Sequence, residues 1–588
     1  MSAKFPEYKG LDLPKVAEEI LEYWQEHKIF EKSVTTREGA KPYVFFEGPP
    51  SANGLPGVHH VLARAIKDIF PRYKTMKGYQ VKRKAGWDTH GLPIELGVEK
   101  ELGITKEDIG QKISVEDYNA ACRTAVMRYT GIWNDLTEKM GYWVDMEDPY
   151  ITYEPKYMES VWWLLKEIYN KKLIYKGYTI QPYSPKAGTG LSSHELNQPG
   201  TYQDVTDTTV VAQFKAIEST LPDFLQNEGT VYFIAWTTTP WTLPSNTALT
   251  VGPKIEYVLV STFNQYTFEP IKVILAKKLV GKQFAGKNNF EVETSEALSA
   301  YNTGDKKIPF YVVKEFIGKD LVNIRYEQIL EYCLPNDNPQ DAFRVIAGDF
   351  VTTEDGTGIV HTAPTFGADD AIVAKQASPE IPPMLIKDAN DNLVPLVNLQ
   401  GKFRPEMGEF AGKYVKNEYY KDGEAPERSI DVELAIKLKI ENKAFKVEKY
   451  KHSYPNCWRT DKPILYYPLD SWFIKVTDVK DRMHSLNKTI NWKPESTGTG
   501  RFGNWLANAN DWNLSRSRYW GIPLPIWRTE DGKEEICVGS VEELKNEMAK
   551  AVAAGVLAKD IFEDFEIGNN SEENYAKIDL HKNIVDEI

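Results

Sequence analysis

The chain has 588 residues, of which 42% are hydrophobic and 26% charged, a balance typical of a folded globular protein. At roughly 150 residues per domain, this length predicts about four domains. The net charge of −13 argues against general coating of nucleic acid, which needs dense cationic charge, and we expect no DNA partner. Apolar stretches such as residues 161–165 are far shorter than the about 20 residues that cross a bilayer, so we expect no membrane partner.

The N-terminus and the cysteines both favour a reducing compartment. Residues 1–15 carry charges of both signs and no apolar core, so no secretory signal is expected. The four cysteines, Cys122, Cys333, Cys457 and Cys537, lie far apart and show no framework spacing. We therefore predict a cytoplasmic protein without disulfides.

The first expected elements are a helix, a strand and a second helix. Asp12 and Pro14 supply cap and first-turn chemistry, and apolar residues then recur at helical spacing as far as Trp24. The apolar run 43–46 predicts a strand that enters a Gly/Pro-rich turn, and a second helix is expected up to Gly78. Strand, glycine-rich turn and helix in this order are typical of a doubly wound nucleotide-binding sheet.

The pattern changes further along the chain. Residues 142–178 are aromatic and predicted to be helical. From about 206 to 400, short β-branched runs alternate with turns, which predicts an inserted β-barrel-like domain; these runs are 208–212, 231–234 and 257–260. Mixed structure follows, and residues 579–588 lack a recognisable closing element, so we expect the natural chain to continue.

A turn before the second helix carries the first candidate site, Gly54-Leu55-Pro56-Gly57-Val58-His59-His60. A helix N-terminus offers free N–H groups and partial positive charge, and so binds phosphate. His59 and His60 could donate hydrogen bonds to phosphate oxygens as charge develops in phosphoryl or nucleotidyl transfer. The alternative interpretation is a pair of surface histidines at a helix cap.

The second candidate site is the sequence Gly86-Trp87-Asp88-Thr89-His90-Gly91-Leu92-Pro93. A strand end with Asp88 next to Trp87 offers a carboxylate for an ammonium group and an apolar wall for a side chain. The alternative interpretation is a turn in which Asp88 caps the following helix.

These two motifs and three later blocks, in this order, resemble the class I aminoacyl-tRNA synthetases, and among them the isoleucine-specific group. Residues 236–246, Trp-Thr-Thr-Thr-Pro-Trp-Thr-Leu-Pro-Ser-Asn, resemble the threonine-rich strand of that family's editing domain. Residues 356–364, followed by Asp369-Asp370, resemble its second editing element, and residues 511–521 resemble the return to the catalytic fold. The resemblance covers nearly the whole chain.

The resemblance implies an α/β fold in which a doubly wound, Rossmann-like nucleotide-binding catalytic domain is interrupted by a large β-barrel-like editing insertion. The domains it implies are an N-terminal helical extension (1–40), the first half of the catalytic domain with a helical insertion (41–205), the editing domain (206–400), a segment returning to the catalytic domain (401–510) and the start of its second half (511–588).

The activity implied is ATP-dependent activation of L-isoleucine to isoleucyl-adenylate, followed by transfer to tRNA(Ile). Catalysis of the first step consists of positioning and of neutralising phosphate charge, with Mg²⁺ from solvent as counter-ion. By resemblance, Asp88 pairs with the α-ammonium of isoleucine. The other residues implied are Gly48 and Pro49 in the amino-acid pocket, Trp512 or Trp520 as its wall, and Gly57, His59 and His60 at ATP.

The resemblance also implies hydrolytic editing of Val-tRNA(Ile). Valine lacks one methylene of isoleucine, too small a difference for binding alone to reject it, and the isoleucyl enzymes are the standard example of this limit. Thr237, Thr238 and Thr239 would line the editing pocket, His361 would exclude the larger side chain, and Asp370 would hold the ammonium of the misacylated ester. Taken alone, the threonine run reads as an ordinary strand.

The chain departs from the family pattern in three places. The family's His-x-Gly-His tetrad reads Gly57-Val58-His59-His60, so that only His60 keeps its place. The Lys-Met-Ser-Lys-Ser-type loop and the anticodon-binding domain, downstream in the family, are not in this sequence. Many relatives bind zinc with two Cys-x-x-Cys pairs, and only one of these four positions is a cysteine in this chain. One thiolate cannot make a tetrahedral site, so we expect no zinc in this segment. The four positions are Ser184, Ala187, Cys457 and Thr460.

Two other functions stay open. A valyl or leucyl relative is one, although Gly86-Trp87-Asp88-Thr89-His90 favours isoleucine over the patterns Gly-Thr-Asp-His-Ala-Gly and Gly-Tyr-Asp-Ala-Phe-Gly. A tRNA-binding deacylase fragment without ligase activity is the other.

Overall fold

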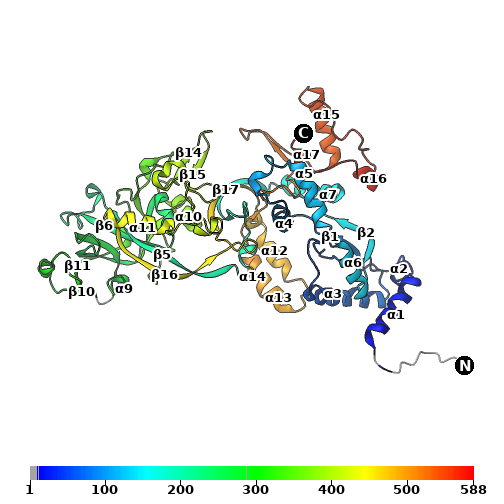
Figure 1. Cartoon of the computed structure of the whole chain (residues 1–588), viewed down its shortest axis with the longest axis horizontal. Helices are drawn as coiled ribbons and strands as arrows, with labels where there is room; N and C mark the ends of the chain where they lie inside the picture. Colours follow the sequence, from blue (N-terminus) through cyan, green and yellow to red (C-terminus); the bar gives the residue numbers. More distant parts are fainter. Residues whose placement is uncertain (1–9, 11, 286–287) are drawn as a thin grey trace. The chain divides into compact units, whose positions relative to one another are not determined.

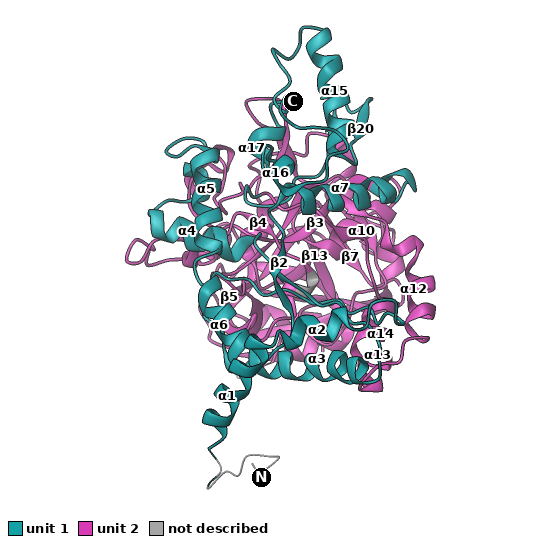
Figure 2. Ribbon diagram, turned by 90° about the vertical axis from the view of Figure 1, so that its right-hand side faces the viewer, with its two compact units in different colours: residues 1–174, 518–588 teal, residues 175–517 magenta. Residues whose placement is uncertain are grey.

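The computed structural model describes residues 10, 12–285 and 288–588, which fall into two compact units (Figures 1 and 2). Unit 1 consists of residues 1–174 and 518–588, and unit 2 of residues 175–517. Unit 1 is therefore built from two stretches separated by the whole of unit 2 in sequence. The structure is of the mixed α/β kind.

Unit 1 is mainly helical, and the strands among its described residues form two small sheets. Strands β1 and β2 pair in parallel, with Gly86 opposite Tyr150 and Trp87 opposite Ile151. Strands β19 and β20 form an antiparallel pair. The elements are α1 (Leu13–Glu26), α2 (Ile29–Thr35), α3 (Val58–Met76), β1 (Lys84–Trp87), α4 (Leu92–Leu102), α5 (Val115–Val126), α6 (Thr130–Lys139), β2 (Asp145–Ile151), α7 (Pro155–Asn170), β19 (Ile526–Arg528), β20 (Glu535–Cys537), α15 (Val541–Ala553), α16 (Glu572–Tyr575) and α17 (Lys582–Val585).

Both predicted N-terminal helices are confirmed. The side chain of Asp12 accepts the backbone N–H of Lys15 at 3.3 Å and so caps α1. Helix α3 ends at Met76, and Gly78 follows with φ of +91°, a left-handed conformation that glycine adopts without steric cost.

Two predictions for unit 1 are wrong. Residues 43–46 form no strand; only Pro42 makes an isolated parallel bridge, to Gln80, and Phe46 is 89% exposed. The segment 142–178, expected to be helical, contains β2, then α7, and then the start of β3 (Ile174–Ser184). A strand forms only where a partner strand satisfies its backbone N–H and C=O groups. Residues 43–46 have no such partner among the described residues, whereas β2 pairs with β1.

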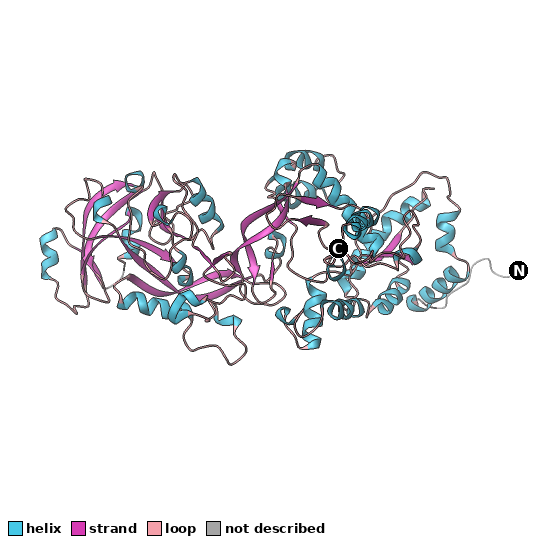
Figure 3. Ribbon diagram, turned by 90° about the horizontal axis from the view of Figure 1, so that it is seen from above, coloured by secondary structure: helices cyan, strands magenta, loops and turns pink. Residues whose placement is uncertain are grey.

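Unit 2 is built around a sheet that has ten strands within the described residues. The three runs predicted as strands are confirmed within β5 (Tyr202–Lys215), β6 (Val231–Thr237) and β8 (Glu256–Phe263). Figure 3 shows the strands of this sheet on the left of the view. The others in the sheet are β7 (Ala248–Val251), β9 (Pro270–Ala276), β10 (Asn289–Glu291), β11 (Ile308–Ile317), β12 (Arg344–Ala347), β13 (Ile359–Thr362) and β16 (Ala444–Pro455).

The large sheet runs in the order β10-β11-β8-β9-β6-β13-β7-β12, with β5 joined to β6 and β16 to β5. No closed barrel is found among the described residues, because this order does not return to its start. Two isolated bridges, Ala216–Tyr326 and Arg325–Arg344, add pairing outside the named strands.

The remaining elements of unit 2 are helices and the strands of smaller sheets. Strands β3, β4, β17 and β18 make one further sheet, and β14 and β15 pair separately. These elements are β4 (Thr189–Gly190), α8 (Ser193–Leu196), α9 (Val280–Gln283), α10 (Ala368–Gln376), β14 (Leu385–Lys387), β15 (Leu393–Pro395), α11 (Ile430–Ile440), β17 (Leu465–Ile474), α12 (Lys480–Asn487), α13 (Glu495–Thr499), α14 (Arg501–Ala507) and β18 (Trp512–Asn513). Short 3-10 helices connect several of them; the one used below is η3 (Pro240–Ser245).

The main core of unit 2 is aromatic and aliphatic, and includes Phe214, Phe233, Tyr257 and Tyr326, each at most 1% exposed. Among the residues that the structure describes, no helix is long and apolar enough to span a membrane.

Candidate functional site

The two histidines predicted at the nucleotide lie side by side at the N-terminus of α3. Their ring centroids are 3.8 Å apart. Nδ1 of His60 accepts the backbone N–H of Gly57 at 2.9 Å, which leaves its proton on Nε2 as a donor. Burial lowers the pKa of His60, and the nearby His59 and Arg64 lower it further. A neutral donor beside a helix N-terminus is suited to phosphate oxygens.

Indole contacts hold His60 in this position. The rings of His60 and Trp133 meet edge to face at 4.8 Å, and Trp133 Nε1 donates to the carbonyl of Gly54 at 2.9 Å. The turn 54–57 is thus tied to α6, the helix that carries Trp133.

The glycine-proline loop before this turn is anchored at Glu47. Its side chain accepts the hydroxyl of Tyr142 at 2.6 Å and pairs with Lys67, while its carbonyl accepts the hydroxyl of Tyr150 at 2.9 Å. Gly48 and Pro49 follow directly, and the backbone N–H of Asp88 donates to the carbonyl of Pro50 at 2.9 Å. The predicted pocket residues Gly48, Pro49 and Asp88 therefore lie in one neighbourhood.

Strand β1 ends at Trp87, so Asp88 opens the turn of residues 88–91, called the substrate turn here. A Cβ on Gly86 would lie 2.5 Å from the Tyr150 ring, so this position accepts only glycine without displacing that ring. Asp88 is an exposed residue, yet the surrounding protein partly desolvates its carboxyl and raises its pKa. The backbone N–H of His90 lowers this pKa, but by less than desolvation raises it. An accessible carboxylate in a partly dry setting can bind a cation.

A buried ion pair fixes the helix after the substrate turn. Arg518 Nε donates to Glu95 Oε2 at 2.6 Å, and its guanidinium also pairs with Glu99. Glu95 Oε1 accepts the backbone N–H groups of Tyr519 and Trp520 at 3.0 and 2.9 Å. Burial alone would lower the pKa of Arg518, but Glu95 and Glu99 outweigh burial and raise it. No local sequence pattern predicts this clamp between α4 and residues 518–520.

The two tryptophans proposed as the pocket wall are in different units. Trp520 is in unit 1, 1% exposed, and its Nε1 donates to the carbonyl of Thr89 in the substrate turn at 2.6 Å. Trp512 is in β18 of unit 2 and 57% exposed. Within unit 1, Trp520 is the one in contact with the substrate turn.

The editing residues predicted on the threonine run and on the second element are brought together in unit 2. Strand β6 ends at Thr237, and its neighbour β13 carries His361. Thr237 Oγ1 accepts the N–H of Thr239 at 3.1 Å, and Thr238 lies between them, half-buried. Thr242 Oγ1, in η3, lies 3.1 Å from His361 Nε2.

His361 is buried and held at both ring nitrogens. Its Nδ1 lies 2.8 Å from the side-chain nitrogen of Asn246, and Asn246 Oδ1 accepts the hydroxyl of Tyr326 at 2.7 Å. Burial lowers the pKa of His361 to about 4, so the ring is neutral at neutral pH. The sequence patterns predicted no role for Asn246 or Tyr326.

Asp370 is in the first turn of α10, where the helix dipole favours negative charge. Its Oδ2 accepts the backbone N–H of Ala363 at 2.8 Å. Burial raises its pKa to about 6, although the Ala363 N–H lowers it. The neighbouring Asp369 is exposed. Of the two carboxylates, Asp370 is the one turned toward the protein.

Sequence reasoning missed a buried charge cluster beside the threonine run. Lys416 is 6% exposed, with its Nζ 3.2 Å from Asp207 Oδ2 and 3.9 Å from Asp431 Oδ2. Asp431 Oδ1 accepts the N–H of Trp241 at 2.9 Å, which fixes the start of η3. Burial raises the pKa of Asp431 to about 7, against the charge of Lys416.

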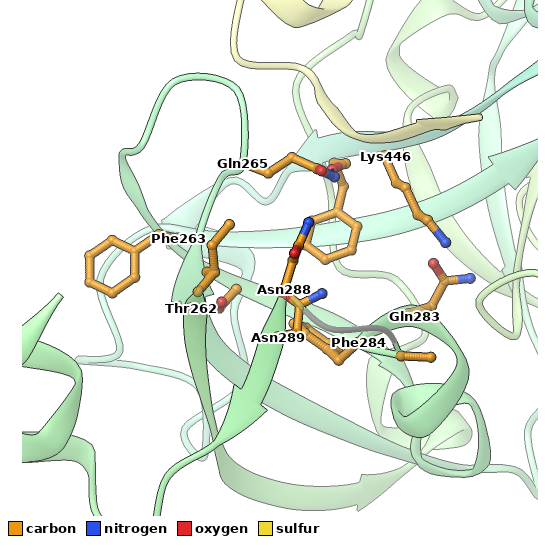
Figure 4. A pocket seen from close by; sticks show the side chains of 11 residues that line it. Thr262, Phe263, Gln265, Gln283, Phe284, Asn288, Asn289 and Lys446 are labelled. Carbon is orange, nitrogen blue, oxygen red and sulfur yellow. The ribbon is translucent and has the colours of Figure 1, made fainter. Parts of the chain in front are cut away.

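Two cavities lie away from these residues. One of about 310 Å³ in unit 2 is lined by amide, aromatic and lysine side chains (Figure 4), namely Thr262, Phe263, Gln265, Gln283, Phe284, Asn288, Asn289, Phe445 and Lys446 among others. Another, of about 740 Å³ in unit 1, has aromatic walls that include Trp24, Phe30 and Trp143. Neither includes a predicted site residue.

The positions at which many relatives bind zinc are Ser184, Ala187, Cys457 and Thr460 in this chain. The Ser184 hydroxyl accepts the N–H of Ala187 at 3.1 Å, Cys457 is buried, and the N–H of Thr460 bonds to the Cys457 carbonyl. Within the described residues, no group of three or more His, Cys, Asp or Glu side chains is arranged to hold a metal ion. The four cysteines are free.

The chain is similar throughout its length to proteins named isoleucine–tRNA ligase. The protein from Bacteroides fragilis is 61% identical over 606 aligned positions, covering 100% of this chain and 52% of that protein. The protein from Cytophaga hutchinsonii is 64% identical, over 93% of this chain and 49% of its own length. The protein from Porphyromonas gingivalis is 58% identical, over 100% of this chain and 52% of its own length. The chain thus spans about half the length of these relatives.

A solved structure, the ternary complex of Agrobacterium radiobacter K84 agnB2 LeuRS-tRNA-LeuAMS, aligns with 90% of this chain and 52% of its own. Its sequence identity to this chain is 14%, and the TM-score is 0.31. The family model described as tRNA synthetases class I (I, L, M and V) matches residues 19–585, and the chain therefore belongs to that family.

Proposed function

We propose that this chain is the part of an isoleucine–tRNA ligase that activates isoleucine and edits its errors. The protein would use ATP to convert L-isoleucine to isoleucyl-adenylate, transfer it to tRNA(Ile), and hydrolyse Val-tRNA(Ile). The observation that carries this proposal is the similarity of 58–64% identity, along the whole chain, to proteins named isoleucine–tRNA ligase.

Activation would take place at unit 1. Asp88 would bind the α-ammonium, since a charge-assisted hydrogen bond is the strongest anchor for a cation. Gly48, Pro49 and Trp520 would enclose the side chain. The N-terminus of α3 with Gly57, His59 and His60 would receive the triphosphate, and the Nε2–H of His60 supports that role. Mg²⁺ would arrive with the nucleotide, bound by its phosphates.

Editing would take place at unit 2. The ester of a misacylated tRNA has lost its carboxylate charge, so the ammonium is its anchor, and Asp370 would bind it. Thr237, Thr238 and Thr239 would line the pocket. His361, held neutral between Thr242 and Asn246, supports a role as a fixed wall that limits side-chain size.

We propose the domain arrangement that the resemblance implies. Residues 41–205 and 511–588 would contribute to a doubly wound, Rossmann-like catalytic domain, and the parallel β1–β2 pair supports this. Residues 206–400 would form a β-barrel-like editing insertion, and strands β6 to β13 of the large sheet, all within these bounds, support a strand-rich insertion there. Residues 1–40 would be an N-terminal extension and residues 401–510 the return to the catalytic domain. Free cysteines are consistent with a cytoplasmic site of action.

The decisive experiment is amino-acid-dependent exchange of pyrophosphate into ATP by the full-length protein, with isoleucine, valine and leucine compared. A higher kcat/KM for isoleucine than for the other two is expected. Preference for valine or leucine would favour the valyl or leucyl alternative. Absence of exchange with all three, together with hydrolysis of Val-tRNA, would favour a deacylase without ligase activity.

A further inference from the structure

The buried charge cluster beside the threonine run is connected to the editing residues through one backbone N–H group. Asp431 is in the first turn of α11, is 4% exposed, and has a different partner at each carboxyl oxygen. Its Oδ2 lies 3.9 Å from Lys416 Nζ, and its Oδ1 accepts the N–H of Trp241 at 2.9 Å. All three residues belong to unit 2. The Asp431 carboxyl thus joins α11 to the start of η3.

The Trp241 N–H needs an acceptor from outside its own helix. The first N–H groups of a helix have no partner within it, and Trp241 is the second residue of η3, after Pro240, which has no N–H. Trp241 is 3% exposed, so the acceptor comes from the protein and not from bulk water. Because a buried N–H without a partner costs free energy, Asp431 favours this position of η3 over others.

The next residue of η3 carries the hydroxyl that contacts His361. Thr242 follows Trp241 directly. Its Oγ1 donates to the carbonyl of Thr239 at 2.8 Å and lies 3.1 Å from His361 Nε2. The ring of Trp241 packs edge to face on Phe366, in the turn before α10, at 5.1 Å. Residues 241–242 therefore contact three parts of the proposed editing site: the threonine run, His361 and the turn that leads into α10.

Lys416 is the counter-charge of Asp431 in this arrangement. Its Nζ is also 3.2 Å from Asp207 Oδ2 and 4.6 Å from the centre of the Tyr454 ring. An unpaired buried carboxylate would be costly, and a cation on the Oδ2 side compensates for this cost while leaving Oδ1 to the N–H. A carboxyl oxygen accepts in both the ionised and the protonated form, so the contact with Trp241 does not depend on the charge of Asp431.

We propose that Asp431, with Lys416 as its counter-charge, is a positioning residue for the editing reaction: its hydrogen bond holds η3 so that Thr242 stays against His361. The inference rests on the proposed function, since it takes His361 as the wall that limits side-chain size. Asp431 acts through η3 and not on the substrate itself. Its loss should therefore change which ester is hydrolysed and leave isoleucine activation unchanged.

Two double variants separate the hydrogen-bond acceptor from the charge. In Lys416→Met/Asp431→Asn, the ion pair is absent but the amide oxygen still accepts the Trp241 N–H. In Lys416→Met/Asp431→Leu, the ion pair and the acceptor are both absent, and leucine keeps the branched shape of the side chain. Both variants lose the same charges, so the acceptor at position 431 is the difference between them.

We expect the Asn double variant to resemble the wild type. In the Leu double variant, the ratio of kcat/KM for Val-tRNA(Ile) deacylation to kcat/KM for Ile-tRNA(Ile) deacylation should fall about threefold to tenfold, the usual worth of one hydrogen bond. A purely structural role would lower the temperature of unfolding without changing this ratio.

A third variant keeps the inference testable if the Leu double variant does not fold. Thr242→Val removes the hydroxyl that lies against His361 and leaves the ion pair in place, and the same ratio should fall. The matched control is Lys413→Met/Glu433→Leu. Lys413 and Glu433 join the same two segments at 2.5 Å through partly exposed side chains, and their variant should have the wild-type ratio.

The measurement is deacylation of Val-tRNA(Ile) and of Ile-tRNA(Ile) by the full-length protein, with isoleucine-dependent pyrophosphate exchange and thermal unfolding followed alongside. If the wild type does not hydrolyse Val-tRNA(Ile), the proposed editing function fails. If the wild type hydrolyses it and the Asn and Leu double variants have the same ratio, the inference alone is overturned. A wild-type ratio in Thr242→Val would also overturn it, because the contact of η3 with His361 would then have no part in discrimination.

Discussion

Asp370→Ala is expected to slow editing tenfold or more without unfolding unit 2. The carboxylate is the proposed partner of the ammonium of valine esterified to tRNA. Loss of a hydrogen bond to a charged group costs about 1.5–3 kcal/mol, which corresponds to a roughly tenfold to hundredfold weakening of binding. Deacylation of Val-tRNA should slow by at least this factor, and isoleucine activation should be unchanged.

Two opposing effects on stability explain why the fold should survive this change. Truncation leaves the Ala363 N–H without its acceptor, at a cost of about 1–3 kcal/mol. It also removes a carboxylate whose pKa is raised from the ordinary 3.8 to about 6, a penalty of about 3 kcal/mol for the ionised form in the folded state. That penalty is fully present above pH 6 and disappears below pH 3.8, so at pH 7.5 the two effects offset each other.

The assay compares the rate of Val-tRNA(Ile) deacylation with isoleucine-dependent pyrophosphate exchange, and thermal unfolding monitors the fold. Asp369→Ala is the matched control, because Asp369 is exposed on the same helical turn and should give a milder effect. The reasoning is refuted if the Asp370 variant deacylates at the wild-type rate, or if activation and deacylation are lost in parallel.

Four further outcomes follow from the same geometry. Deacylation by the wild type should fall as pH drops through about 6, because protonation removes the Asp370 charge; a flat profile from pH 5 to 8 would contradict this. Asp88→Ala should lower isoleucine-dependent exchange by tenfold or more and leave deacylation intact, and an unchanged exchange rate would refute the ammonium assignment. Glu95→Gln should lower the free energy of unfolding by about 3–5 kcal/mol in urea titrations, because it breaks a buried pair with Arg518, whereas Glu101→Gln on the same helix, at an exposed pair, should match wild type. Metal analysis after dialysis should find well below one zinc per chain, and stoichiometric zinc would point to other ligands.

Local patterns were sufficient for several elements. Helix α1 begins after an Asp12 cap, and α3 shows helical spacing with Gly78 beyond its end. Strands β5, β6 and β8 coincide with β-branched runs, since such residues pack well on a pleated surface. In each case the information lies within about twenty residues of chain.

Pairing between distant segments could not be predicted. Residues 43–46 have the composition of a strand but no described partner strand, whereas β2, with the unpromising sequence Asp-Met-Glu-Asp-Pro-Tyr-Ile, pairs with β1 some 60 residues earlier. An apolar pattern identifies the segments that can form strands. Which of these segments do form strands depends on whether a partner strand lies beside them.

The candidate site was also predictable only in part: local features could be predicted from the sequence, but contacts between distant residues could not. The position of Asp88 after a strand was predicted from Trp87 and the turn that follows. The choice of Trp520 over Trp512 depends on a hydrogen bond to Thr89, 431 positions away, and the contact of His90 with His581 spans 491 positions. No local spacing encodes such contacts.

The Glu95–Arg518 clamp has a consequence for folding during synthesis. At about 5–20 residues per second, the 423 positions that separate the two side chains take roughly 20–85 s to translate. During that interval the carboxylate destined for the interior has no partner, and α4 cannot be completed as it stands in the finished molecule. Unit 2 is continuous in sequence and emerges whole in the meantime. The order of events on the ribosome is therefore the reverse of the order in the chain: the inserted unit is complete first, and the unit that begins the polypeptide closes around residues 518–520 last.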